Sequence, residues 1–201
     1  MFDEVRAIIA QQQGDDSIRV YACVRQPEDW KDTCGIDWSD HETARRGLVD
    51  EYFADCSGDL KRVILECRDE LVLRPMHMLP VGVRWEHRPA VTLIGDSAHL
   101  MTPFAGVGVN CALADALVLA RALVGKKDGF FAKAFSDEHN ISAAIKEYEK
   151  FMFNLSNENA EETWQGLQGH FSKNGGKERS DKFFAMYEGQ TGRKIDKGLF
   201  N

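Results

Sequence analysis

The sequence has 201 residues, of which 43% are hydrophobic and 28% are charged, and its formal net charge is −7. A chain of this size can bury a sizeable core, and its acidic balance, without an arginine-rich patch, argues against a nucleic-acid partner. The five cysteines form no Cys-x-x-Cys pair, so we expect reduced thiols, with neither disulfides nor a metal site. The sequence shows no signal peptide and no apolar stretch long enough to cross a bilayer, so we expect a cytoplasmic protein without a membrane span.

The first predicted elements are a strand and two helices. Ile18–Val24 alternates apolar and polar side chains with the two-residue period of a half-buried strand. Ser39 and Glu42 form a capping-box pattern ahead of a helix that we expect to end near Asp55. Asp59 is expected to cap a second helix, whose apolar residues share one face.

Two further strands are predicted before the middle of the chain. Residues 71–79 form an apolar run that Pro75 interrupts, which suits an edge strand or a bulge. Residues 91–94 are a short apolar run that we expect to be a buried strand. Gly95 and Asp96 follow at its carboxyl end, which is where ligands bind in open α/β sheets.

A glycine-containing loop and a helix come next. Gly106 and Gly108 lie in the loop, and the helix is expected to begin at Asn110 and to end at Gly125. The Asp96 carboxylate suits sugar-type hydroxyls, and glycines let a flat ligand approach the backbone. The first N–H groups of a helix favour negative charge on whatever lies against them. A flavin has a polyol chain, a flat ring system and a ring edge that becomes anionic on reduction, so it is the ligand that we expect here.

This segment resembles the second flavin motif of the FAD-dependent monooxygenases related to para-hydroxybenzoate hydroxylase, especially the salicylate-hydroxylase-like and tetracycline-degrading branches. The positions that match in type and order are Gly95, Asp96, His99, Pro103, Gly106, Gly108, Asn110, Asp115 and Ala116. The resemblance implies that Asp96 holds the ribityl hydroxyls of FAD and that residues 103–110 pack along the isoalloxazine. The cofactor-binding residues that it implies are Gly95, Asp96, Pro103, Gly106, Val107, Gly108, Val109 and Asn110.

The resemblance also places the segment before the flavin motif near the meeting point of substrate and flavin. His77 and Met78, together with Phe104, are therefore candidate substrate contacts, and ordinary packing is the alternative. Other interpretations apply within the motif as well. Asp96 alone would fit a turn, His99 has no second ligand nearby for a metal, and Arg121 suits a paired or rim position on a buried helix.

The C-terminal third carries a weaker pattern. Apolar residues over 141–155 recur at helical spacing, with Glu149 among the charged residues assigned to the solvent side. From Gly166 to the end the chain is polar, and a loosely docked tail is expected there.

The expected fold is α/β with α+β character, as the C-terminal portion of a two-domain flavin monooxygenase. Family members begin with a Gly-x-Gly-x-x-Gly fingerprint that cradles the FAD pyrophosphate, whereas this sequence has only Gly-x-Gly near Gly106. We expect part of the substrate-domain sheet with helices over residues 1–88. The strand, loop and helix of the FAD-binding motif should occupy residues 89–126. C-terminal helices and a tail should occupy residues 127–201.

The function that the resemblance implies is insertion of one oxygen atom from O2 into an organic substrate of aromatic or polyketide type. NADPH or NADH would reduce the FAD, and no side chain needs to be a catalytic acid, base or nucleophile. The alternative is a truncated, non-catalytic FAD-binding-domain remnant or interaction module. We also expect the chain on its own to bind FAD weakly and to associate with itself through exposed sheet edges.

Overall fold

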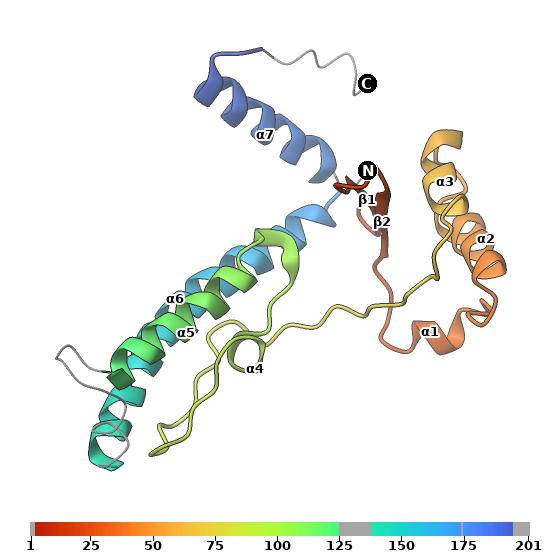
Figure 1. Ribbon diagram of the computed structural model, residues 1–201. Coiled ribbons are helices and arrows are strands. Elements are labelled where there is room, and N and C mark those ends of the chain that lie inside the picture. Colours follow the sequence, from red (N-terminus) through yellow and green to blue (C-terminus); the bar gives the residue numbers. More distant parts are fainter. Residues whose placement is uncertain (1–2, 125–137, 174, 195–201) are drawn as a thin grey trace. The chain divides into compact units, whose positions relative to one another are not determined.

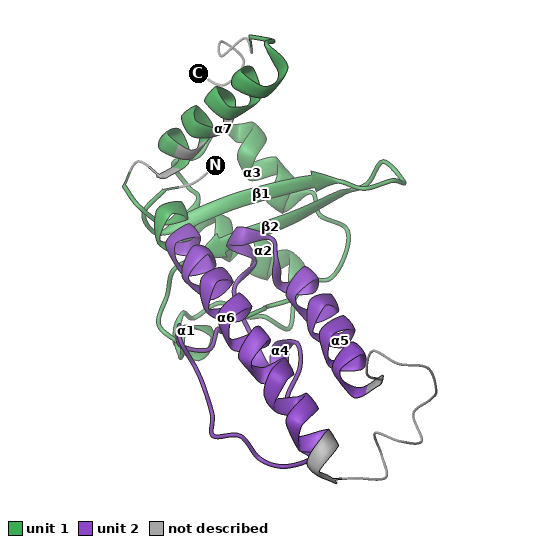
Figure 2. Ribbon diagram, turned by 90° about the vertical axis from the view of Figure 1, so that its left-hand side faces the viewer, with its two compact units in different colours: residues 1–75, 168–201 green, residues 76–167 purple. Residues whose placement is uncertain are grey.

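The computed structural model describes residues 3–124, 138–173 and 175–194 (Figure 1). It divides into two compact units, one of residues 1–75 with 168–201 and one of residues 76–167 (Figure 2). All five cysteines lie within the described part and are free thiols. Among the described residues, no helix is both long enough and apolar enough to cross a membrane.

In its described residues, the first unit contains a two-stranded antiparallel sheet and four helices. Its elements are β1 (Arg6–Gln12), β2 (Ile18–Val24), α1 (Trp30–Thr33), α2 (His41–Tyr52), α3 (Gly58–Leu65) and α7 (Gly175–Thr191). Arg6 pairs with Val24 at one end of the sheet and Gln12 pairs with Ile18 at the other, so the strand predicted at Ile18–Val24 is confirmed as β2. Ile8 packs with four buried residues, which are Leu48 and Val49 of α2, its C-cap residue Phe53, and Ile64 of α3.

Both predicted helices of this unit form, but their caps differ from the prediction. Asp40, not Ser39, caps α2 by accepting the Glu42 N–H at 3.1 Å. Ser39 instead donates its hydroxyl to Asp37 at 2.6 Å in the preceding turn. Similarly, Ser57 caps α3, and Asp59 lies inside its first turn. Short polar side chains cluster before both helices, and the local turn geometry decides which of them reaches the helix N–H groups.

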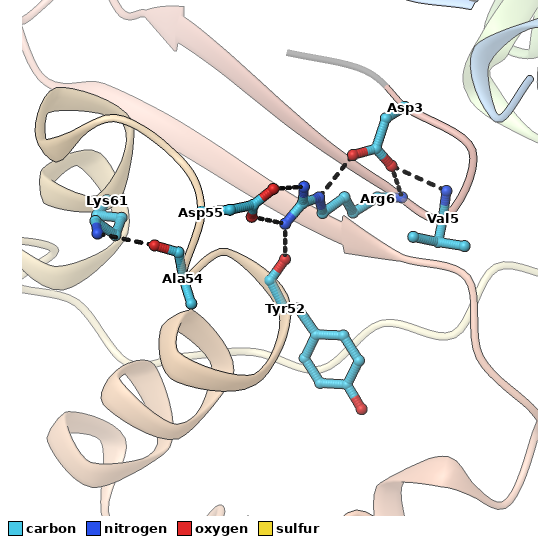
Figure 3. A network of polar contacts seen from close by, with 7 residues as sticks. All are labelled: Asp3, Val5, Arg6, Tyr52, Ala54, Asp55 and Lys61. Carbon is cyan, nitrogen blue, oxygen red and sulfur yellow. Dashed lines mark hydrogen bonds and ion pairs between the residues drawn. The ribbon is translucent and has the colours of Figure 1, made fainter. Parts of the chain in front are cut away.

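Arg6 joins the start of the sheet to the end of α2 (Figure 3). Its guanidinium donates to Asp3 Oδ2 at 2.7 Å and to Asp55 Oδ2 at 2.7 Å, and it also donates to the Tyr52 carbonyl. The hydrogen bond from Arg6 holds the pKa of Asp55 below its ordinary value. One side chain thus fixes β1 against the turn between α2 and α3.

The second unit is built around two long helices. Its elements are α4 (Asp96–His99), the 3₁₀ helix η1 (Pro103–Ala105), α5 (Gly108–Val124) and most of α6 (Glu138–His170). α4 lies between α5 and α6 (Figure 2). The core consists of Ala98 from α4 with three buried residues of α6, which are Tyr148, Met152 and Phe153, and Val118 and Leu119 of α5 pack against it.

Two predicted strands are absent from the described structure. Residues 71–79 have no regular secondary structure, and residues 91–94 form only an isolated bridge between Arg88 and Val91. Val91 and Leu93 are 61% and 42% exposed, not buried. An extended apolar segment becomes a strand only when a neighbouring strand satisfies its N–H and C=O groups, and no described segment does so here.

The helical predictions in the C-terminal half agree better with the structure. α5 begins at Gly108, two residues before Asn110, and Gly125 lies outside the described residues. The helix predicted over 141–155 is confirmed as part of α6, which extends to His170. Within the segment expected to be a polar tail, residues 175–191 form α7, and its loose docking stays a prediction.

Candidate functional site

The Gly95–Asp96 turn is the centre of the candidate site. Gly95 precedes α4 with φ 59° and ψ −142°, a conformation that glycine adopts without the steric penalty of a Cβ. A Cβ at this position would also lie 3.5 Å from the Cβ of Ala112 on α5. Asp96 follows as the first residue of α4, and its side chain is exposed. The turn therefore presents a carboxylate to solvent from a backbone that packs closely on α5.

A buried pair of polar side chains lies beneath this turn. Asp115 is 0% exposed, and its Oδ2 accepts the Gly95 N–H at 2.9 Å. The same oxygen lies 2.6 Å from Nε2 of His99, which is also buried. His99 therefore has a structural partner, as expected from its lack of a second metal ligand. Asp115 Oδ1 and His99 Nδ1 are buried without a hydrogen-bond partner among the described residues.

Tyr148 of α6 supports the same segment from another helix. Its side chain is fully buried, and its hydroxyl donates to the Leu93 carbonyl at 2.9 Å. Burial raises the pKa of this phenol above its ordinary value, and the nearby negative charge of Asp115 raises it further. Tyr148 therefore stays protonated and acts as a hydrogen-bond donor. The backbone on the N-terminal side of Asp96 is thus held by both α5 and α6.

Glu149 fixes the segment that leads into the turn. Although the sequence pattern placed it on the solvent side, its side chain is buried. It accepts hydrogen bonds from Trp85 Nε1 at 3.0 Å and from Thr92 Oγ1 at 3.0 Å, and its Oε2 lies 2.7 Å from His87 Nδ1. These three donors satisfy the carboxylate, so Glu149 is a structural residue that attaches residues 85–92 to α6.

The predicted ring-contacting loop lies on the surface between α4 and α5. Gly106 has φ 71° and open space around the position that a Cβ would take. Pro103, Val109 and Asn110 are exposed, whereas Val107 and Gly108 are half-buried. The loop therefore offers accessible backbone directly before the first N–H groups of α5, where a flat anionic group can be accommodated.

The predicted substrate contacts come from two segments, since His77 and Met78 precede α4 and Phe104 lies within the loop. His77 is exposed and Met78 is half-buried. The next residue, Leu79, donates its N–H to the Leu100 carbonyl at 2.8 Å, which anchors this segment next to the end of α4. Phe104 is half-buried against α6, where a Cβ at Gly166 would lie 3.2 Å from its own Cβ. Their roles as substrate contacts stay predictions.

Among the residues of the flavin motif, only His99 lines a small cavity of the second unit. The cavity measures about 20 Å³ and has His99, Leu79, Gly82 and Asn157 among its walls. Such a volume accommodates about one water molecule and not a flavin. A cofactor at the candidate site would therefore lie on the open surface formed by the turn, the loop and the start of α5. The exposed Asp96 carboxylate and the open space at Gly106 fit that position.

Comparison with known proteins identifies the sequence family. Residues 81–130 match a family model described as an FAD binding domain. Monooxygenase asqM of Emericella nidulans is 36% identical over 151 residues, which are 68% of this chain and 33% of that protein. The chain belongs to the superfamily of FAD-dependent monooxygenases.

Two further relatives agree with this assignment. Monooxygenase penA of Penicillium thymicola is 36% identical over 137 residues, covering 63% of this chain and 31% of that protein. A salicylate hydroxylase of Pseudomonas putida is 38% identical over 82 residues, covering 41% of this chain and 18% of that protein. The chain thus spans about a third of the length of asqM and penA.

The sequence prediction missed the supporting residues of the site. Asp115 was part of the motif, but its hydrogen bond to the Gly95 N–H was not anticipated, and neither were the contacts of Tyr148 and Glu149. Only Asp115 gave a signal in the sequence, as a charged residue within a mostly apolar helix, whereas Glu149 fitted the pattern of a solvent-facing residue. Arg121, by contrast, is exposed, as a rim group would be.

Proposed function

We propose that this chain supplies the ribityl-binding and ring-binding part of the flavin site in an FAD-dependent NAD(P)H monooxygenase. The proposal rests on the exposed Asp96 carboxylate. The backbone next to Asp96 is fixed by hydrogen bonds, since Asp115 accepts the Gly95 N–H and Tyr148 donates to the Leu93 carbonyl. That turn lies inside the segment that matches the FAD binding domain. The proposed reaction inserts one oxygen atom of O2 into an organic substrate.

Different residues of the segment would contact different parts of the flavin. Asp96 would accept hydrogen bonds from the ribityl hydroxyls, because an ionised carboxylate is a strong acceptor. Residues 103–107 would lie along the ring, where Gly106 leaves room for it. The N–H groups at Gly108, Val109 and Asn110 have no acceptor inside the helix by geometry, so they would stabilise negative charge on the ring edge.

Bound FAD would supply the redox chemistry, with NADPH or NADH as the electron donor. The contribution of this chain is to orient the flavin and to provide an electrostatic environment for its reduced form. This division of labour needs no catalytic acid or base among the described residues. His77, Met78 and Phe104 are the proposed substrate contacts, and an aromatic or polyketide-like substrate would suit their apolar and π-bearing side chains.

The proposed organisation is that of the C-terminal portion of a two-domain flavin monooxygenase. Residues 1–88 would form part of the substrate domain, residues 89–126 the FAD-binding motif, and residues 127–201 the C-terminal helices. Exposed apolar residues over 91–94 would favour self-association of the chain on its own. A cytoplasmic location stays a prediction.

Flavin titration of an Asp96 variant tests the proposal. Asp96→Ala should raise the dissociation constant for FAD about 10-fold to 150-fold, which corresponds to the roughly 1.5–3 kcal/mol of a hydrogen bond to a charged group. Glu86→Ala is the matched control, because Glu86 is also an exposed acid of this unit but lies outside the predicted contacts. Flavin fluorescence reports the binding, and the titration should extend to millimolar FAD. Equal affinities of both variants and the parent chain would remove Asp96 from the site.

A turnover assay separates the enzyme from the non-catalytic alternative. A binding remnant would still respond to Asp96→Ala in the flavin titration, but it would not oxidise NADPH or NADH. Oxidation that depends on both FAD and O2 would support the monooxygenase.

A further inference from the structure

The candidate site contains a short helix that one oxygen atom holds at both ends. The N–H of Gly95, directly before α4, donates to Asp115 Oδ2 at 2.9 Å, and Nε2 of His99, the last residue of α4, lies 2.6 Å from the same oxygen. Asp96 lies between these two attachments, with its carboxylate exposed. The short helix that carries Asp96 is therefore attached to Asp115 of α5 at both of its ends.

We propose that Asp115 and His99 are positioning residues that hold the Gly95–Asp96 turn in its flavin-binding conformation. The inference rests on the proposed function, because it assigns these residues a role in the same FAD site. Neither residue would touch the flavin, since both side chains are buried. They act through the backbone that carries Asp96.

The turn needs such support because of its backbone conformation. Gly95 has a positive φ, and glycine has more conformational freedom to lose than any other residue. Without a fixed acceptor for its N–H, the Gly95 backbone would sample other conformations and Asp96 would change direction. Asp115 is a strong acceptor in this position because it is charged and removed from water.

In the described structure, the two donors satisfy only one oxygen of the buried Asp115 carboxylate. His99 Nε2 and the Gly95 N–H both serve Oδ2, whereas Oδ1 has no partner among the described residues. An apolar side chain at position 115 would fill the same space without a desolvation penalty. A buried charge at this point is thus better explained by the turn that it orients than by packing alone.

Two variants at position 115 distinguish a role of Asp115 in orienting the Gly95–Asp96 turn from a role in packing alone. Asp115→Ala removes the acceptor and should raise the dissociation constant for FAD about tenfold or more. Asp115→Asn keeps a carbonyl oxygen that can take the place of Oδ2, so it should restore affinity to within about threefold of the parent chain. Arg121→Ala is the control, because Arg121 is exposed on the same helix and should leave affinity unchanged.

Hydrogen exchange gives a readout that does not depend on the flavin. In the flavin-free 201-residue chain, labelled with ¹⁵N, the Gly95 amide should exchange about tenfold faster or more in Asp115→Ala than in the parent, while amides of α6 keep their protection. Asp115→Asn should restore the slow exchange. If Asp115→Ala does not fold, His99→Ala takes its place, since it releases only one end of α4 and should weaken FAD binding about threefold or more.

The outcomes separate this inference from the proposed function. Weaker binding by Asp96→Ala together with parent-like binding and parent-like Gly95 exchange in Asp115→Ala would overturn the positioning role and leave the flavin site standing. Parent-like FAD binding by both variants would overturn the proposed function and this inference with it. Loss of affinity in Asp115→Ala without recovery in Asp115→Asn would also overturn the inference, because it would indicate a packing defect.

Discussion

Replacing Glu149 should destabilise the second unit more than any exposed acid of the same helix. Glu149→Ala leaves three donors without their acceptor, those of Trp85, His87 and Thr92. Hydrogen bonds to a charged group contribute about 1.5–3 kcal/mol each, which sets an upper limit of about 4.5–9 kcal/mol for three. The three donor residues are half-buried, so water can replace part of each bond. We therefore expect a loss of about 3 kcal/mol in the free energy of unfolding.

Urea unfolding followed by tryptophan fluorescence and by far-UV circular dichroism measures this loss. Glu147→Ala is the matched control, because Glu147 is exposed two residues earlier on α6 and should change stability by less than about 0.5 kcal/mol. Glu149→Ala should lower the urea midpoint of the transition that α6 reports. A free energy of unfolding for Glu149→Ala within 0.5 kcal/mol of the control value, a margin of about the usual surface effect, would refute the structural role of Glu149.

Three other predictions concern the loop, the sheet and the exposed face of α5. Gly106→Val should abolish FAD binding, because the branched side chain fills the open space at the loop and is strained at the positive φ of Gly106, whereas the helices should keep the far-UV spectrum nearly unchanged. Normal flavin affinity would show that the loop does not contact the ring. Hydrogen bonding to Arg6 lowers the pKa of Asp55 below its ordinary value of 3.8. The interaction therefore stabilises the fold fully at pH values above 3.8, and this stabilisation is lost as the pH falls through the lowered pKa. Asp55→Asn should therefore reduce the loss of stability in acid, and an identical acid transition in a pH titration would contradict this. Leu113 and Leu117 are 65% and 50% exposed one turn apart, so changing both to glutamate should shift light-scattering masses toward the monomer; no shift would exclude this face from self-association.

Local patterns predicted the elements whose form depends on nearby residues. The alternation in β2, the capping-box pattern before α2 and the helical periods of α3, α5 and α6 all correspond to observed elements. β1 was not predicted, because its sequence changes from apolar to polar along its length and its pairing with β2 decides its structure. Residues 91–94 have a stronger strand pattern than β1, yet no described strand pairs with them. Strand formation depends on a partner that the local sequence does not specify.

The candidate site, like the fold, was predictable only where its residues lie close together in sequence. The motif identified the turn, the glycine loop and the start of α5, since these lie close together in sequence. The supporting contacts join distant positions, such as Asp115 with Gly95 and Glu149 with Trp85, which are 20 and 64 residues apart. A buried charge such as Glu149 looks like a solvent-facing residue until the donors from another segment are placed around it.

Mapping FAD onto the chain residue by residue tests whether the Gly95–Asp96 turn and the following loop form a flavin site. FAD should be titrated into the ¹⁵N-labelled 201-residue chain, with amide chemical shifts recorded up to millimolar ligand, because this readout detects weak binding as well as tight binding. Saturable shift changes should be concentrated at Gly95, Asp96 and residues 103–110, and they should be lost in Asp96→Ala but not in Glu86→Ala. Saturable changes confined to other residues, or no saturable change in this segment, would contradict the assignment of a flavin site to it.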